Sequence, residues 1–263
     1  MKRKRKRPLL RAPAFFLLLL LLCLTGRRIA LYMQSRSEYA GIREKAVRPV
    51  PEETGDEDEG KEDSFPEDAL RIDWDALGEI RPSAWLKIGD ISYPVMHADE
   101  NEYYLHRLPD GTANPGGSLF LQAENSPDFS DRHSIIYGHN MADGSMFGTL
   151  KQFADEKWAD MRFDLYLPDG SLHRYRLFSV VRTEGGSEAF RISFSGSGDF
   201  LRYQKMMLKQ SLYGNHVKVS AENRLLTLST CSGPQGTRLR LLVQGAEEHV
   251  WRGESRPDRE QGM

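Results

Sequence analysis

Cys231 is the residue of this sequence best suited to covalent chemistry. It lies near the end of the run LTLSTCSG (226–233), and the only other cysteine, Cys23, lies inside an apolar N-terminal run. A cysteine attacks as its thiolate, and an ordinary thiol with a pKa of roughly 8.5 is mostly protonated at neutral pH. Cys231 therefore needs a histidine or a cation beside it to act as a nucleophile.

Among the seven histidines, His139 is the best placed to be that base. It closes the apolar run IIY and precedes NMADGSMFG, a stretch rich in turn formers and small residues. A histidine at a strand end before a loop is well placed to face a cleft. The other six stand singly among charged or loop residues and are interpreted as surface or packing residues: His97, His106, His133, His173, His216 and His249.

Two arginines near the C-terminus could supply the cation. Arg238 and Arg240 alternate with Leu239 and Leu241, so both are expected on one face of a strand. Two arginines on such a face usually meet solvent. A hairpin-like return after Cys231 would bring one of them near the sulfur, where a permanent cation could stabilise an oxyanion. The spacing alone leaves open which one.

The N-terminus has the pattern of a secretory signal or a signal anchor. Residues 1–11 are basic, and residues 12–24 form an uninterrupted apolar run that Ile29–Met33 could extend. No A-x-A cleavage site follows, so an uncleaved anchor over residues 12–33 is favoured. The positive charge then places residues 1–11 in the cytoplasm and the rest of the chain outside. Because exported proteins usually pair their cysteines, a lone Cys231 indicates either an intermolecular link or a reactive group.

The remaining chain divides by composition into a linker, a domain and a tail. Residues 34–69 are predicted to be an acidic, extended linker, because PEETGDEDEGKEDSFPED (51–68) is too charged to bury a core. The folded domain is expected over residues 70–247, and residues 248–263 are expected to be a solvated tail. A net charge of −2 gives no basic bias, so no nucleic-acid partner is expected. No metal-binding cluster is visible, and no cofactor is expected.

Short apolar segments between turn residues predict a mainly β domain. Helical spacing is expected in 72–80, in 144–155 and most strongly in 199–213. Two strands across a Gly-Asp turn are predicted in 84–98, and two strands across a Pro-Asp-Gly turn in 162–184. Further strands are predicted at 117–123, 133–139, 216–220, 224–230 and 238–245. Together these elements predict a closed or nearly closed barrel with a few short helices.

The motifs taken together resemble the sortases, and more closely the class B sortases of Gram-positive bacteria. TLSTC is followed nine residues later by an arginine in RLLVQG, and IIYGHNM precedes it by about ninety residues. The stretches WLKIGDISYPVMHADENEYYLHRLPDG and GSLFLQAENSPDFSDRHSIIYGHNMADGSMFGTL also resemble class B, as does the helix inserted at 199–213. The resemblance runs from about Asp73 to Gly245 and implies an eight-stranded sortase-type β-barrel with short helices, behind an N-terminal membrane anchor.

The resemblance also implies roles for particular residues. Cys231 would be the nucleophile and His139 the general acid/base. Arg240 would be the cation, because it lies five residues before Gly245 as in the family's R-x-V-V-x-G ending, with Arg238 as the alternative. Positions lining the sorting-signal groove of relatives match Asn101 and Leu105. Ser229, on the same strand face as the cysteine, is either a third substrate contact or a structural strand residue.

The implied activity is that of a membrane-anchored cysteine transpeptidase. It would cleave the C-terminal sorting signal of an exported protein at a threonine carbonyl and transfer the protein to the amine of a peptidoglycan precursor. A pilin-polymerising sortase, whose amine is a pilin lysine, stays open, as does a catalytically silent surface module on the same fold. A papain-like protease is disfavoured, because it predicts more cysteines and a helix-borne nucleophile.

Overall fold

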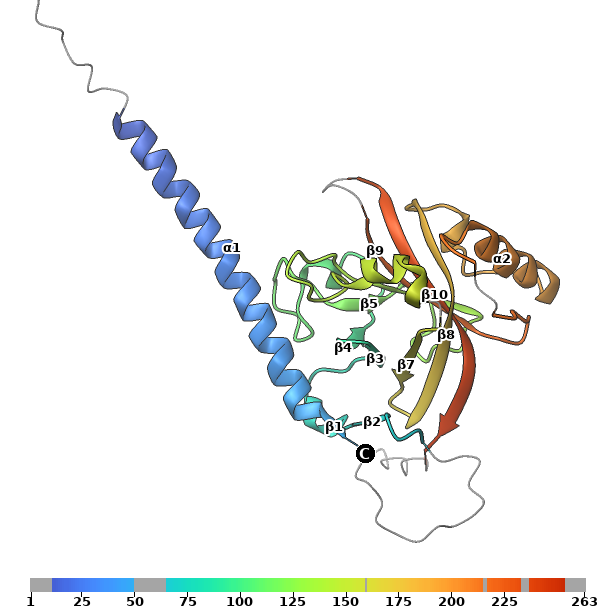
Figure 1. The fold of residues 1–263 in the computed structure, drawn as a ribbon. Coiled ribbons are helices and arrows are strands. Elements are labelled where there is room, and N and C mark those ends of the chain that lie inside the picture. The colour runs from blue at the N-terminus through green and yellow to red at the C-terminus, as the bar shows by residue number, and fades with distance from the viewer. Residues whose placement is uncertain (1–10, 50–64, 159, 215–216, 233–236, 254–263) are drawn as a thin grey trace, which may run out of the picture.

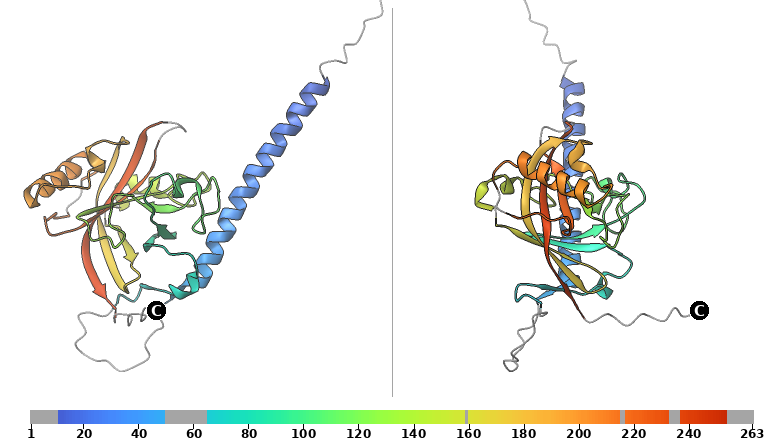
Figure 2. Two further views of the ribbon diagram at one scale, coloured as in Figure 1. Left: turned by 180° about the vertical axis from the view of Figure 1, so that it is seen from behind. Right: turned by 90° about the vertical axis from the view of Figure 1, so that its right-hand side faces the viewer.

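A closed barrel of eight strands forms the centre of the computed structural model, which describes residues 11–49, 65–158, 160–214, 217–232 and 237–253. Two helices lie on opposite sides of this barrel, a long N-terminal one and a short one (Figures 1 and 2). The predicted mainly β, eight-stranded fold is therefore confirmed. The barrel strands are β3 (Ala84–Ile88), β4 (Ile91–Met96), β5 (Leu119–Leu121), β6 (His133–Tyr137), β7 (Arg162–Tyr166), β8 (Ser171–Glu184), β9 (Leu225–Cys231) and β10 (Leu239–Arg252).

The strand order around the barrel decides which loops are long. The order is β10-β8-β7-β3-β4-β5-β6-β9, and β9 closes the ring against β10. Two neighbouring pairs, β4–β5 and β6–β9, are parallel, and the others are antiparallel. Parallel neighbours cannot be joined by a tight hairpin, so a long connection must link each pair. The first of these connections, residues 97–118, borders the candidate site described below.

The β7–β8 hairpin shows how local sequence fixes the register. Gly170 adopts φ +88°, which an L side chain rarely tolerates, and Asp169 Oδ1 accepts a hydrogen bond of 2.8 Å from Ser171 N. The turn joins β7 to β8, whose apolar side chains, among them Phe163 and Leu165, lie in the barrel core. The Pro-Asp-Gly turn predicted from the sequence is therefore present.

A second, smaller core lies on the outer face of the barrel. The helix α2 (Ser197–Gln210) packs Phe200, Tyr203 and Met207 against outward-facing side chains of β8, β9 and β10. Below it, the fully buried His133 places Nδ1 2.7 Å from Arg191 O and Nε2 2.7 Å from Thr227 Oγ1. These contacts confirm that His133 is a packing residue.

The helix α1 (Arg11–Ala46) is uninterrupted and has two different parts. Its first part exposes a run of phenylalanine and leucine side chains, and α1 is the one helix of the described residues that is long and apolar enough to cross a membrane. This supports the predicted anchor. Its last part packs on the barrel through Ser35, Tyr39, Ile42 and Ala46, which recur every three or four residues and are buried.

The extended linker predicted to begin at residue 34 is wrong for residues 34–49. These residues continue α1 and then form β1 (Val47–Pro49), which pairs with β2 (Leu70–Ile72). The cause is the helical spacing of the four buried positions, which anchors the segment to the barrel. Most of the acidic run, residues 50–64, lies outside the described residues.

Three local predictions differ from the structure because glycines and packing override the side-chain pattern. In 72–80 only Asp75–Leu77 is helical, as a single 3₁₀ turn. In 144–155 the chain first turns, with Gly148 N bonded to Ser145 O, and is helical only over Leu150–Ala154, followed by Glu156–Trp158. Residues 217–220 form no strand, because Val217 and Val219 pack against the second core instead.

Two boundaries also differ. The helix predicted at 199–213 starts at Ser197 and ends at Gln210, because the chain then bonds to β8 through Leu212 N and Val180 O, 2.8 Å apart. The solvated tail predicted from residue 248 is wrong for residues 248–252, which continue β10 as far as Arg252 and pair with the start of β8. Two further 3₁₀ turns lie at Tyr104–His106 and Glu188–Phe190.

Candidate active site

Cys231 is the last residue of β9, and its thiol is free and exposed. Alternate side chains of a strand point to opposite faces. Leu226 and Leu228 lie in the barrel interior, whereas Leu225 and Thr227 face the second core. By this alternation Cys231 lies on the outer face of the barrel. It is the one exposed residue of a strand whose other side chains are all buried.

The chain that follows β6 brings His139 level with Cys231. β6 and β9 are parallel, and their pairing ends with Tyr137 opposite Ser229. The pairing then continues by one more bond, because Gly138 N donates to Ser229 O at 3.1 Å. His139 is two residues beyond Tyr137, just as Cys231 is two residues beyond Ser229.

Two side chains hold these strand ends together. Thr230 Oγ1 donates to Gly138 O at 2.8 Å, and Asn140 Nδ2 donates to Cys231 O at 2.8 Å. The backbone of the cysteine is therefore fixed while its thiol stays accessible. Asn140 was not among the predicted site residues, and its only sequence signal is its position directly after His139 in GHN.

Arg240 lies on the other side of the cysteine. In the antiparallel register of β9 and β10 it is the direct partner of Cys231, so both side chains point to the same face. Its Nη1 donates to Thr237 O at 3.1 Å and to Leu239 O at 3.0 Å. Arg238 instead precedes β10, and its Nη2 donates to Gly185 O at 2.7 Å. The register thus brings Arg240 to the cysteine, while Arg238 contacts the loop after β8.

The environment of His139 fixes which of its nitrogens carries the proton. Nε2 lies 2.7 Å from Leu105 O, and because a carbonyl can only accept, Nε2 must donate. Burial lowers the pKa of His139; the bond to Leu105 O opposes this shift, and the charge of His106 adds to it. The imidazole is therefore mainly neutral at pH 7, with its Nδ1 lone pair left as the proton acceptor.

The predicted substrate contacts differ in their surroundings. Ser229 is 1% exposed, and its Oγ has no hydrogen-bond partner among the described residues. Leu105 touches the site through its backbone carbonyl, and its side chain is half-buried. Asn101 Oδ1 accepts a bond of 2.9 Å from Ala123 N, which ties its loop to the end of β5. The structure thus brings Ser229 and Leu105 to the cysteine–histidine pair and gives the Asn101 oxygen a structural bond.

His106 is a site residue that sequence analysis set aside as a surface or packing residue. Its ring stacks on that of His139, with centroids 5.8 Å apart and planes inclined by 24°. Nothing in its sequence surroundings indicates this contact, because it depends on the fold of residues 97–118.

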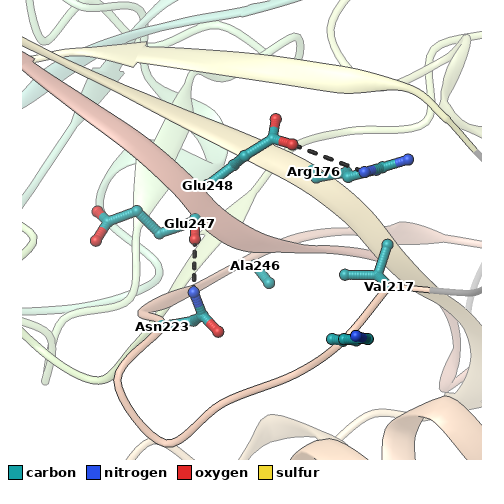
Figure 3. Close-up of a pocket in the computed structure, with 7 residues that line it drawn as sticks. Arg176, Val217, Asn223, Ala246, Glu247 and Glu248 are labelled. Atoms are coloured by element: carbon teal, nitrogen blue, oxygen red, sulfur yellow. Dashed lines mark hydrogen bonds and ion pairs between the residues drawn. The ribbon is translucent and has the colours of Figure 1, made fainter.

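A separate cavity of about 400 Å³ lies further along β10 (Figure 3). Two contacts join polar groups of its lining: Arg176 Nη1 lies 3.7 Å from Glu248 Oε1, and Asn223 Nδ2 donates to Glu247 O at 2.9 Å. Neither Cys231 nor His139 lines it. The cavity is therefore distinct from the candidate site, which lies at the end of β9 where Cys231 is exposed.

Comparison with known proteins identifies the family. Residues 87–248 match the sortase domain family. Sortase B of Listeria monocytogenes is 34% identical to this chain over 166 residues, which are 61% of this chain and 67% of that protein.

Solved structures agree with this match. The structure of sortase B from Listeria monocytogenes superposes with a TM-score of 0.56 and 33% identity, covering 62% of this chain and 92% of that one. A structure of sortase B from Bacillus anthracis gives a TM-score of 0.66 at 26% identity, covering 83% of this chain and 98% of that one. A family match over more than half of the chain, relatives named sortase B and the shared barrel together place this chain in the sortase family, within class B.

Proposed function

We propose that this protein is a cysteine transpeptidase with Cys231 as nucleophile, His139 as general acid/base and Arg240 as the cation that stabilises the oxyanion. The observation that carries the proposal is the register of three neighbouring strands. β9 ends on Cys231 with Arg240 directly opposite on β10. On its other side lies β6, and His139 follows two residues after the end of that strand. Membership of the sortase family supports the same assignment.

The first half of the reaction forms a thioacyl enzyme. The thiol of Cys231 gives its proton to His139 Nδ1, and the sulfur attacks the carbonyl carbon of a threonine in the sorting signal. Arg240 stabilises the negative charge that develops on the carbonyl oxygen. The intermediate collapses as the carbon–nitrogen bond breaks, and the imidazolium returns the proton to the departing amine.

The second half transfers the acyl group. An amine of a peptidoglycan precursor attacks the thioester carbonyl and gives a proton to His139. The carbon–sulfur bond breaks, an amide forms, and the thiolate of Cys231 recovers its proton from the imidazolium. The neutral state of His139 suits this half, because a lone pair is needed before the amine attacks.

The substrate is proposed to lie along the outer face beside β9. There the buried Ser229 hydroxyl, which has no partner among the described residues, would bond to the sorting signal. Leu105 would pack against an apolar side chain of the signal, and Asn101 would donate from its amide nitrogen. The α1 helix would hold the catalytic domain on the outer surface of the membrane, with the N-terminus in the cytoplasm.

The experiment uses the full chain in detergent micelles with a panel of fluorogenic sorting-signal peptides. Each peptide is offered with no amine, with a wall-type amine such as glycine or a diamino acid, and with a lysine peptide that imitates a pilin. We expect cleavage, an amide product with the wall-type amine, and a thioacyl adduct on Cys231 by mass spectrometry.

Two variants serve as controls for this experiment. Cys231→Ala is expected to lose the adduct and all turnover, and His139→Ala to lose about 10²–10⁴-fold in kcat/KM. If an amide product forms only with the lysine peptide, the acceptor is a pilin lysine and not the amine of a wall precursor. Absence of both cleavage and adduct with every peptide would leave a silent surface module as the better explanation.

A further inference from the structure

The loop of residues 104–118 connects α1 with the candidate active site. On its α1 side, the Tyr39 hydroxyl donates to Gly117 O at 2.8 Å and lies 2.9 Å from Ser118 Oγ. About two turns earlier along the helix, Leu31 O accepts a bond of 3.0 Å from the buried Asn114 side chain. The last part of α1 is thus bonded to this loop at two points.

The chain packs closely at two glycines of this loop. Gly117 has φ +56°, and a Cβ added there would lie 2.4 Å from Leu105 O. A Cβ added at Gly116 would lie 2.9 Å from Ser35 Oγ, on α1. Gly117 therefore lies directly on the Leu105 carbonyl, and Gly116 lies against the Ser35 side chain of α1, so a displacement of residues 116–118 must displace that carbonyl.

On its other side the same loop orients His139. Leu105 O accepts the 2.7 Å bond from His139 Nε2, and the neighbouring His106 is the titratable side chain stacked on the His139 ring. The bond to Leu105 O is what leaves Nδ1 as the proton acceptor of the proposed reaction. The position of that one carbonyl therefore decides both the tautomer and the direction of the imidazole.

We propose that Tyr39 is a positioning residue for catalysis, which acts through Gly117, Ser118 and the Leu105 carbonyl on the imidazole of His139. The membrane-side helix is then part of the catalytic apparatus and does more than attach the domain to a membrane. This inference rests on the proposed role of His139 as general acid/base. It adds that the acid/base group is held from a helix more than 90 residues away in sequence.

Tyr39→Phe tests the role of the hydroxyl because it keeps the ring and its edge-to-face contact with Tyr93, whose centroid is 5.1 Å away. The matched control is Tyr166→Phe, which removes a buried tyrosine hydroxyl that bonds to Leu70 N at 2.9 Å and has no link to the loop. Both variants are made in the full chain, in detergent micelles. The readouts are kcat and KM with a cleaved sorting peptide, and the NMR titration of the labelled His139 imidazole.

We expect Tyr39→Phe to lower kcat about tenfold with KM within twofold of the wild-type value, because the chemical step depends on the exact position of the base. The pKa of His139 should fall further, since the bond to Leu105 O raises it. Tyr166→Phe should change neither quantity.

Two results would overturn the inference. The first is that Tyr39→Phe keeps the wild-type kcat and the wild-type titration of His139. The second is that kcat falls equally in Tyr39→Phe and Tyr166→Phe, which would indicate a purely structural role for the Tyr39 hydroxyl. The NMR titration needs no turnover. It therefore tests the link from Tyr39 to His139 even if no sorting peptide reacts and the proposed function fails.

Discussion

The two ends of the long strands β8 and β10, with their neighbours β7 and β9, differ in how their polar groups are hydrogen-bonded. At the hairpin end, Arg174 forms a two-point ion pair with Asp164, at 2.7 and 2.8 Å, and His173 Nδ1 lies 2.7 Å from Glu247 Oε1. At the other end, Cys231 has a free thiol and Ser229 Oγ has no partner among the described residues. The charged groups named at the first end therefore bond to one another, whereas a thiol and a buried hydroxyl at the second end have no partner among the described residues.

This difference separates residues that hold the barrel together from residues that carry the proposed chemistry. A satisfied, buried ion pair is strongly destabilising to break, because one charge is then left without its partner. A buried hydroxyl without a partner lowers the stability of the folded chain, and the proposed bond between Ser229 and the substrate would offset that cost. Variants at the two ends should therefore affect different measurements.

Asp164→Asn should give the largest loss of stability. The Asp164 and Arg174 side chains are only 10% and 15% exposed, so removing one charge should lower the free energy of unfolding by about 3 kcal/mol or more. Denaturant unfolding followed by tryptophan fluorescence measures this, and activity per folded molecule should stay unchanged. The control is Asp160→Asn. The Asp160 carboxylate pairs with Arg176 but is 86% exposed, so this variant should lose at most about 1 kcal/mol of unfolding free energy. Equal losses in the two variants would contradict the proposed importance of burial.

Arg240→Ala should have the opposite signature. We expect kcat/KM to fall by about 10²–10³-fold, because the oxyanion loses its cation, while the unfolding free energy changes little. Arg238→Ala is the matched control. The Arg238 guanidinium bonds to Gly185 O, and Arg240, not Arg238, is the residue opposite Cys231. It should change kcat/KM by less than about threefold. A larger effect for Arg238 than for Arg240 would reverse the assignment of the cation.

His133, in the second core between the two ends, should make stability depend on pH. Burial lowers its pKa from 6.5 to about 4, so between these values the unfolded chain binds a proton that the folded chain does not. Stability should therefore fall as pH drops below about 6.5, by roughly 3 kcal/mol at pH 4, and stay constant above pH 7. Unfolding of the wild type and of His133→Gln from pH 4 to pH 7 measures this. An equally steep loss in the variant would assign the effect to other groups.

Most of the barrel could be predicted from the sequence because its strands have a simple pattern. Turn residues such as Asp169 and Gly170 separate apolar runs, and α2 has an apolar face that packs on the barrel. Two predictions failed where the pattern was ambiguous. In the predicted strand 216–220, Val217 and Val219 pack against the second core without forming a strand, and residue 216 lies outside the described residues. Four buried positions between Ser35 and Ala46 occur among charged residues, so the sequence of that helix resembled a linker.

Part of the candidate site could not be predicted, because backbone groups and register decide it. Residue types and spacing identified Cys231 and His139 as candidates, but they could not separate Arg238 from Arg240, which depends on strand pairing with Cys231. The carbonyl that holds His139 belongs to Leu105, and a side-chain pattern carries no information on a carbonyl. The contacts of Asn140 and His106 likewise arise only once distant loops meet.

The continuity of α1 sets the direction in which the barrel faces. The helix has 36 residues and is about 54 Å long, so its apolar start and its docked end belong to one rod. Each residue of a helix adds about 1.5 Å of rise and a rotation of about 100°. Inserting one residue between Gly26 and Leu31 would therefore rotate the barrel by about 100° around the apolar segment, whereas seven residues, about two turns, would restore its original direction. In the proposed membrane-anchored protein, the number of residues in α1, and not only its composition, would therefore set the direction in which Cys231 faces relative to the membrane.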